Sequence, residues 1–159
     1  MAFTEQYLNS YLQELSSYHH SVAQRTKDKK AALTHYQKAA LLYQEYIDTF
    51  PKDSKTLEMK FLLGEALFAS HRYAEAIQAY NDVAYPIVAA QPDSLFNKRA
   101  EAGYAAIMAY EAQLRRVSPE QSADWKARQL SSLLQFVNTY HNDPRASKVL
   151  QQAMGLLYS

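Results

Sequence analysis

Apolar and aromatic residues recur every three to four positions along almost the whole chain, and this spacing limits the possible folds more than any other feature. One face of a helix repeats at that interval, so each such run predicts an amphipathic helix. Seven runs are present, at 7–25, 32–50, 57–70, 73–85, 96–116, 119–137 and 144–158. Three glycines and five prolines among 159 residues are too few for the many tight turns of a sandwich or barrel. The sequence therefore predicts an all-α fold of about seven helices.

Local signals predict where several of these helices begin and end. Pro86 has no backbone N–H to donate, so the fourth helix should end or kink there. Ser94 is a candidate N-cap for the fifth helix, which should run on through residue 96. Ser118 and Gln121 have the spacing of a capping box, with Pro119 at the first helical position between them. The sixth helix should therefore begin at Pro119.

The charge balance argues against nucleic-acid binding. The chain has 17 basic and 16 acidic side chains and a net charge of +1, whereas proteins that bind nucleic acid usually carry a strong positive excess. Its densest basic cluster, at 25–38, fits a polar turn between helices better than a site for an acidic partner or for lipid headgroups. No apolar run approaches the roughly 18 residues of a membrane span, so we expect no membrane insertion.

The sequence contains no recognisable arrangement for metal binding or catalysis. Without cysteine the chain can form neither a disulfide nor a cysteine-rich zinc site. His19 and His20 are adjacent and point to different sides of a helix, and no His-Glu-x-x-His or comparable spacing occurs. Carboxylates such as Glu65 and Glu101 have no nucleophile motif or glycine-rich phosphate loop around them. We therefore expect no metal, no cofactor and no enzymatic activity.

The chain contains an internal repeat. Residues 43–53, YQEYIDTFPKD, align without gaps with residues 133–143, LLQFVNTYHND. The glycines also follow a pattern, since Gly64, Gly103 and Gly155 all fall inside predicted helices. A glycine within a helix costs about 1 kcal/mol relative to alanine, so we expect each one to mark a close approach of another backbone.

This organisation resembles that of the tetratricopeptide repeats, in which units of about 34 residues each pair two antiparallel helices. The likeness is clearest in the first-helix and second-helix patterns of the middle unit, Leu63, Gly64 and Leu67 followed by Tyr73, Ala76 and Tyr80. Residues 36–51 repeat the second-helix pattern, whereas the usual first-helix tryptophan is missing from the middle unit. The resemblance implies a right-handed α-solenoid of antiparallel helical hairpins that forms a single domain over 1–159. Its approximate units are 4–50, 54–90, 94–140 and a leftover helix at 144–158.

Two finer expectations follow from this resemblance. The tyrosine-rich helix that ends at Phe50-Pro51 and the segment RYAEAI at 72–77 are similar to members of the family from the bacterial cell envelope. These include outer-membrane assembly lipoproteins and large periplasmic or motility-associated repeat proteins, so the likeness implies a periplasmic or envelope location. The leftover helix has no partner helix after it, and we expect the chain to be part of a longer repeat protein.

The resemblance also implies where a partner would bind. In this family the first helix of each unit lines a concave face, and the residues beside the signature positions point into it. Carried over to this chain, the partner-binding positions are Phe61, Glu65, Phe68, Asn97, Tyr104, Ile107 and Met108. An apolar and aromatic stripe with a few polar groups suits the capture of an extended peptide or a helix.

We therefore expect a non-catalytic scaffold that binds a protein or peptide partner in a concave groove. Phe61, Phe68 and Tyr104 would anchor the partner, and Glu65 and Asn97 would fix its orientation. Two alternatives stay open: the stripe is instead covered by neighbouring helices, or the chain is an assembly module. In the second case the leftover helix docks onto another copy through Val149, Leu150, Met154 and Leu157.

Overall fold

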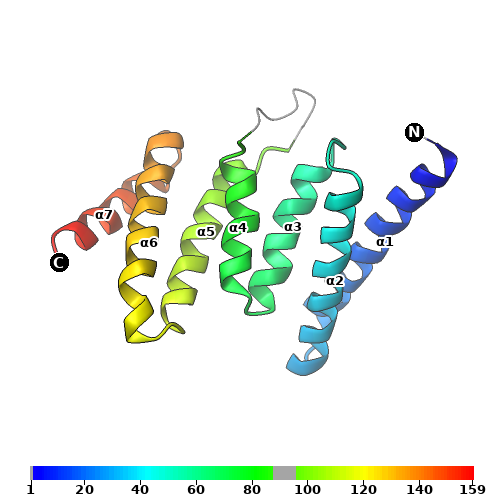
Figure 1. Cartoon of the computed structure of the whole chain (residues 1–159), viewed down its shortest axis with the longest axis horizontal. Coiled ribbons are helices and arrows are strands. Elements are labelled where there is room, and N and C mark those ends of the chain that lie inside the picture. Colours follow the sequence, from blue (N-terminus) through cyan, green and yellow to red (C-terminus); the bar gives the residue numbers. More distant parts are fainter. Residues whose placement is uncertain (1, 88–95) are drawn as a thin grey trace.

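The computed structural model describes residues 2–87 and 96–159, and its ordered elements in those residues are all helices (Figure 1). They are α1 (Phe3–Arg25), α2 (Lys29–Thr49), α3 (Thr56–Ala69), α4 (Tyr73–Ala84), α5 (Arg99–Leu114), α6 (Pro119–Thr139) and α7 (Ala146–Leu157). The predicted all-α fold is confirmed. Ser94, the expected N-cap, and the predicted unit boundaries at 90 and 94 lie outside the described residues.

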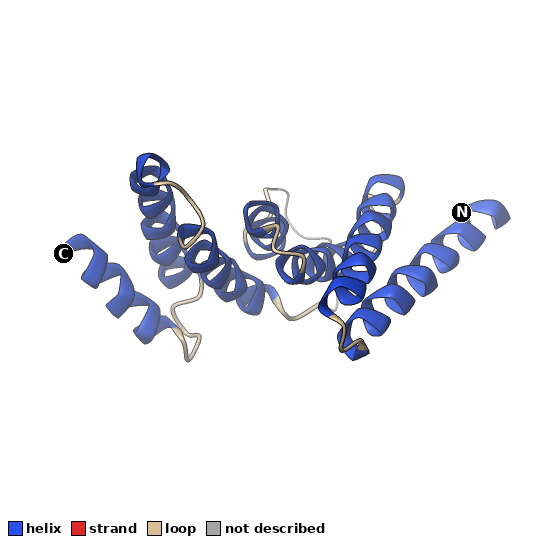
Figure 2. Ribbon diagram, turned by 90° about the horizontal axis from the view of Figure 1, so that it is seen from below, coloured by secondary structure: helices blue, strands red, loops and turns tan. Residues whose placement is uncertain are grey.

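The helices form a row in which each packs mainly against its neighbours in the sequence. This is the order of a helical solenoid, whose stability comes from neighbouring contacts rather than from one central core. Figure 2 shows α1 and α7 at the two ends of this row, next to the chain termini. The buried side chains accordingly form a large cluster over α1–α5, a second over α5–α7 and a small third one that joins α4 to α5.

The turns before α3 and α7 repeat one backbone structure. The N–H of Asp53 donates to the carbonyl of Phe50 at 3.2 Å, and the N–H of Asp143 donates to the carbonyl of Tyr140 at 2.9 Å. In both turns an oxygen of the aspartate also accepts from the N–H two residues later, at 2.9 Å. These aspartates occupy matching positions in the sequence repeat. The internal repeat is therefore also a repeat of structure.

One predicted helix start and one predicted helix cap differ from the structure. Residues 96–98 are not helical, so α5 begins at Arg99 rather than at residue 96. The start of α6 at Pro119 is confirmed, but the Ser118 side chain makes no capping hydrogen bond. The carbonyl of Ser118 accepts from the N–H of Gln121 at 3.0 Å, so this N–H is not left for the side chain. The capping-box prediction is wrong for that reason.

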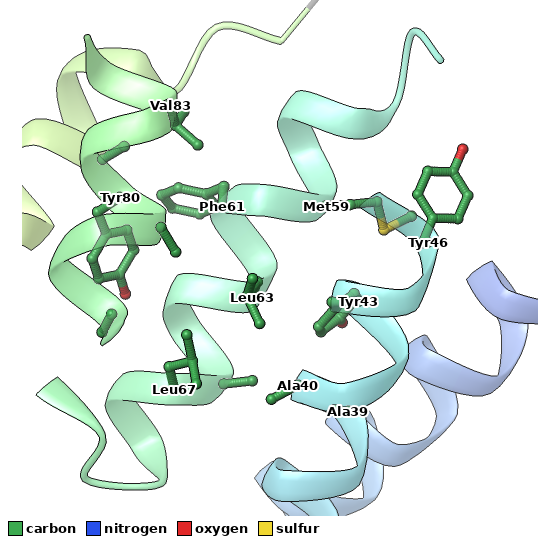
Figure 3. Close-up of a cluster of buried hydrophobic side chains, with 14 of the residues drawn as sticks. Ala39, Ala40, Tyr43, Tyr46, Met59, Phe61, Leu63, Leu67, Tyr80 and Val83 are labelled. Atoms are coloured by element: carbon green, nitrogen blue, oxygen red, sulfur yellow. The ribbon is translucent and has the colours of Figure 1, made fainter. Parts of the chain in front are cut away.

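The three glycines have different surroundings. A Cβ atom on Gly64 would lie 2.7 Å from the ring of Tyr80, and one on Gly103 would lie 3.1 Å from the ring of Phe136. In both cases the close neighbour is an aromatic side chain and not the expected backbone. A Cβ on Gly155 would meet nothing within 4 Å, so the predicted close approach is wrong there. Figure 3 shows Tyr80 packed among the buried side chains of α3 and α4.

Candidate functional site

The predicted partner-binding residues come from α3, from α5 and from the segment before α5. Those whose side chains reach the surface are Glu65, Phe68, Asn97, Tyr104 and Met108. Met108 and Asn97 are exposed, whereas the other three are half-buried between helices. These side chains are available to a partner without any rearrangement of the helices.

Phe61 and Ile107 are both buried in the core, and for Ile107 the prediction that it faces a partner is wrong. The Phe61 side chain is 4% exposed, and its ring centroid lies 5.9 Å from that of Tyr80 and 5.6 Å from that of Phe96. Ile107 is 1% exposed and packs in the cluster that joins α5 to α6 and α7. A helix inside the row is covered from more than one side, so an apolar residue near a signature position need not point into a groove.

Three adjoining hollows follow the odd-numbered helices. The first, of about 470 Å³, lies between α1 and α3, and the second, of about 490 Å³, lies between α3 and the segment before α5. The third, of about 370 Å³, lies between α3 and α5. Glu65 lines all three, so they form one continuous surface, which we call the groove. Its lining includes Gln13, His20, Glu58, Leu62, Glu65, Phe68, Tyr104 and Met108. The largely buried Phe61 also lines the second and third hollows, so this predicted residue borders the groove with little exposed area.

The carboxylate of Glu65 is partly desolvated where the hollows meet. Burial raises the pKa of Glu65, and the negative charge of Glu101 on α5 raises it further, whereas Lys98 lowers it. The charged form is disfavoured both by lost hydration and by a like charge nearby. A positively charged or hydrogen-bond-donating group of a partner would therefore be favoured at this point of the groove.

Arg145 closes the far side of the third hollow and is held in place by Asp143. Its Nε and Nη2 atoms donate to the two carboxylate oxygens of Asp143, each at 2.8 Å. The same guanidinium lies 5.0 Å from the centroid of the Tyr104 ring. Bidentate pairing fixes a guanidinium more firmly than a single contact does. The hollow thus has aromatic walls and fixed charges, which suit oriented binding.

The contribution of α1 to the groove was not predicted from the sequence. Gln13, Ser17 and His20 line the first hollow. The signal was the polar character of the inward side of α1, where Ser16 and His20 are buried. The Nδ1 atom of His20 lies 2.8 Å from the hydroxyl oxygen of Tyr43, which ties α1 to α2.

Among the described residues, no group of three or more histidine, cysteine, aspartate or glutamate side chains is placed to hold a metal ion. None of the described helices is both long enough and apolar enough to cross a membrane. The geometry thus defines an all-helical solenoid with a groove. Comparison with protein-family models, with curated proteins and with solved structures gives no match.

From the burial of His20 we expect the stability of the α1–α2 pair to depend on pH. Burial lowers the pKa of His20 below the value of about 6.5 that histidine has in an unfolded chain. The unfolded state therefore takes up a proton first as the pH falls, so stability is full above about 6.5 and decreases below it. We expect a lower free energy of unfolding at pH 5.5 than at pH 7.5, measured by urea denaturation.

The variant His20→Gln is the control for this prediction, because an amide retains a polar partner for Tyr43 but does not titrate. It should lose stability at pH 7.5, and its further loss between the two pH values should be smaller than that of the parent protein. An equal further loss in both proteins would show that groups other than His20 cause the pH dependence.

Proposed function

We propose that this protein is a tetratricopeptide-like scaffold that binds a segment of a partner protein in the groove. The observation that carries the proposal is the continuity of the three hollows at Glu65. The groove is formed by several packed helices and thus exists before a partner arrives, which lowers the entropic cost of binding. Phe68, Tyr104 and Met108 supply apolar contact area, as recognition of a peptide or helix requires.

The proposal assigns no bond-making step to this surface. The charged side chains in it would orient a partner: Glu65 offers a desolvated acceptor, and Arg145 offers a guanidinium fixed by Asp143. The exposed Asn97 borders the second hollow and would add a polar contact there. By the same resemblance to envelope members of the family, we propose an envelope location in a bacterium.

A display library of random peptides, selected on the folded protein, tests the proposal. Two groove variants, Glu65→Lys and Met108→Glu, should weaken the selected peptides at least tenfold, measured by fluorescence anisotropy. The matched control is Leu41→Glu on α2, because Leu41 is exposed but lines none of the three hollows. Peptides that bind all three variants equally would rule out the groove as the binding surface.

A second candidate function is assembly of the protein through α7. Leu150, Met154 and Leu157 are all exposed on that helix, between 41% and 54%. Val149 is 0% exposed in the cluster that joins α5 to α7, so the prediction that it takes part in docking is wrong. Neighbouring apolar side chains left uncovered in this way are typical of interaction surfaces.

A further inference from the structure

The exposed apolar residues of α7 form a face like those that a neighbouring helix covers elsewhere in the row. We call Leu150, Met154, Leu157 and Tyr158 the C-terminal stripe. In the alignment that relates the two repeated turns, Met154 corresponds to Gly64 and Leu157 to Leu67. Gly64 lies against Tyr80 of α4, and Leu67 is buried. Leu67 and Tyr80 are both labelled in Figure 3. Met154 and Leu157 of the C-terminal stripe thus match positions on a helix that packs against the tyrosine-bearing α4.

The opposite end of the row presents such a helix. Tyr7, Tyr11 and Tyr18 of α1, which we call the tyrosine stripe, are between 49% and 68% exposed. The rings of Tyr7 and Tyr11 are stacked, with centroids 6.4 Å apart and planes inclined by 11°. This arrangement presents a flat aromatic surface to the outside. Large aromatic residues lose little conformational entropy on association and therefore make effective contact surfaces.

The spacing of the tyrosine stripe is that of the helices that cover their neighbours within the chain. Tyr11 and Tyr18 are seven residues apart, like Tyr36 and Tyr43 in α2 and like Tyr73 and Tyr80 in α4. Tyr43 and Tyr80 are both buried at contacts between helices. The tyrosine stripe therefore has the pattern of a covering face, but no helix of the described chain covers it.

The two stripes face away from the row at its opposite ends. At 100° per residue, the tyrosine stripe lies on the other side of α1 from Asn9, Ser16 and His20, which are buried against the rest of the row. Figure 1 shows α1 and α7 at the two ends of the row. Two such faces cannot meet within one molecule, but they can meet between two copies.

The charges on the two helices are complementary as well. α1 carries Glu5 and Glu14 and has no lysine or arginine before Arg25, whereas α7 carries Lys148 and no acidic residue. The opposite net charges of the two helices favour contact between α1 and α7 and disfavour contact of either helix with its own counterpart. A thioether next to an aromatic ring adds a favourable contact, which Met154 would provide.

We propose that copies of this protein associate head to tail, with the tyrosine stripe of one copy packed on the C-terminal stripe of the next. This inference rests on the second candidate function, assembly through α7, and identifies the surface that α7 meets. The contact joins two different surfaces, so each added copy leaves one stripe of each kind free and the assembly can grow.

Sedimentation velocity of the whole chain at increasing concentration tests the proposal, with one variant for each end. Tyr7→Glu with Tyr11→Glu blocks the tyrosine stripe, and Met154→Glu with Leu157→Glu blocks the C-terminal stripe. The parent protein should form dimers and larger species as concentration rises, and each blocked variant alone should be monomeric. An equal mixture of the two variants should form a dimer and nothing larger, because each supplies the stripe that the other lacks.

Leu41→Glu, an exposed change away from both stripes, should associate like the parent, and circular dichroism should show unchanged helix content in every variant. If the variant with a blocked tyrosine stripe still associates while the other does not, α7 pairs with another surface: assembly stands and the head-to-tail contact is wrong. A parent protein that stays monomeric at every concentration overturns both.

Discussion

Replacing Phe136 with alanine should lower the free energy of unfolding by about 3–5 kcal/mol, the range for removing a large aromatic side chain from a core. Phe136 is 0% exposed on α6, at the centre of the cluster that joins α5, α6 and α7. Its ring lies 5.5 Å from that of Tyr140 and 6.3 Å from that of Tyr104, between centroids. The cavity left by alanine would remove contacts with all three helices at once.

The damage should be local, because the helices contact mainly their neighbours in sequence. Hydrogen exchange should show lost protection in α6 and α7 while α2, α3 and α4 keep theirs. Leu134→Ala on the same helix is the control, since Leu134 is exposed, and it should change stability by no more than about 0.5 kcal/mol. Equal loss of protection in all helices would show that the row unfolds as one cooperative unit.

The helical architecture could be predicted because its signals are local. The start of α6 at Pro119 was predicted to the residue, from a proline at the first helical position. The loss of apolar spacing predicted an end of α1 near Arg25, where the helix does end. The start of α5 was harder to predict from the sequence. Residues 96–98 continue the apolar spacing, but the ring of Phe96 packs on Phe61 of α3 from outside any helix. Periodicity does not distinguish such a contact from a helical turn.

The candidate site was predicted less well, because exposure depends on which helices cover a residue. Phe61 and Phe68 are both apolar residues of α3 beside signature positions and both line the third hollow, yet Phe61 is buried and Phe68 is only half-buried. The raised pKa of Glu65 likewise depends in part on the negative charge of Glu101, which lies on another helix. Neither relation has a signature in the local sequence, since each depends on how separate helices are packed.

Replacing Gly64 with alanine is the second change from which we expect a large effect. Alanine should favour the helix by about 1 kcal/mol over glycine. At Gly64, however, the new Cβ would lie 2.7 Å from two atoms of the Tyr80 ring, closer than packed atoms can approach. Tyr80 is buried, so its ring has little room to move. Overpacking of this kind costs more than the helix gains, and we expect a net loss of about 1–3 kcal/mol in urea denaturation.

The matched control is Gly155→Ala, because it makes the same chemical change within a helix but at a site with no atom within 4 Å. Here only the helix preference acts, and stability should rise by up to about 1 kcal/mol. If the two substitutions change the free energy of unfolding in opposite directions, then contact with Tyr80, and not helix preference, is the reason that position 64 requires glycine. If Gly64→Ala also stabilises the protein, α3 and α4 must pack less closely than the structure shows.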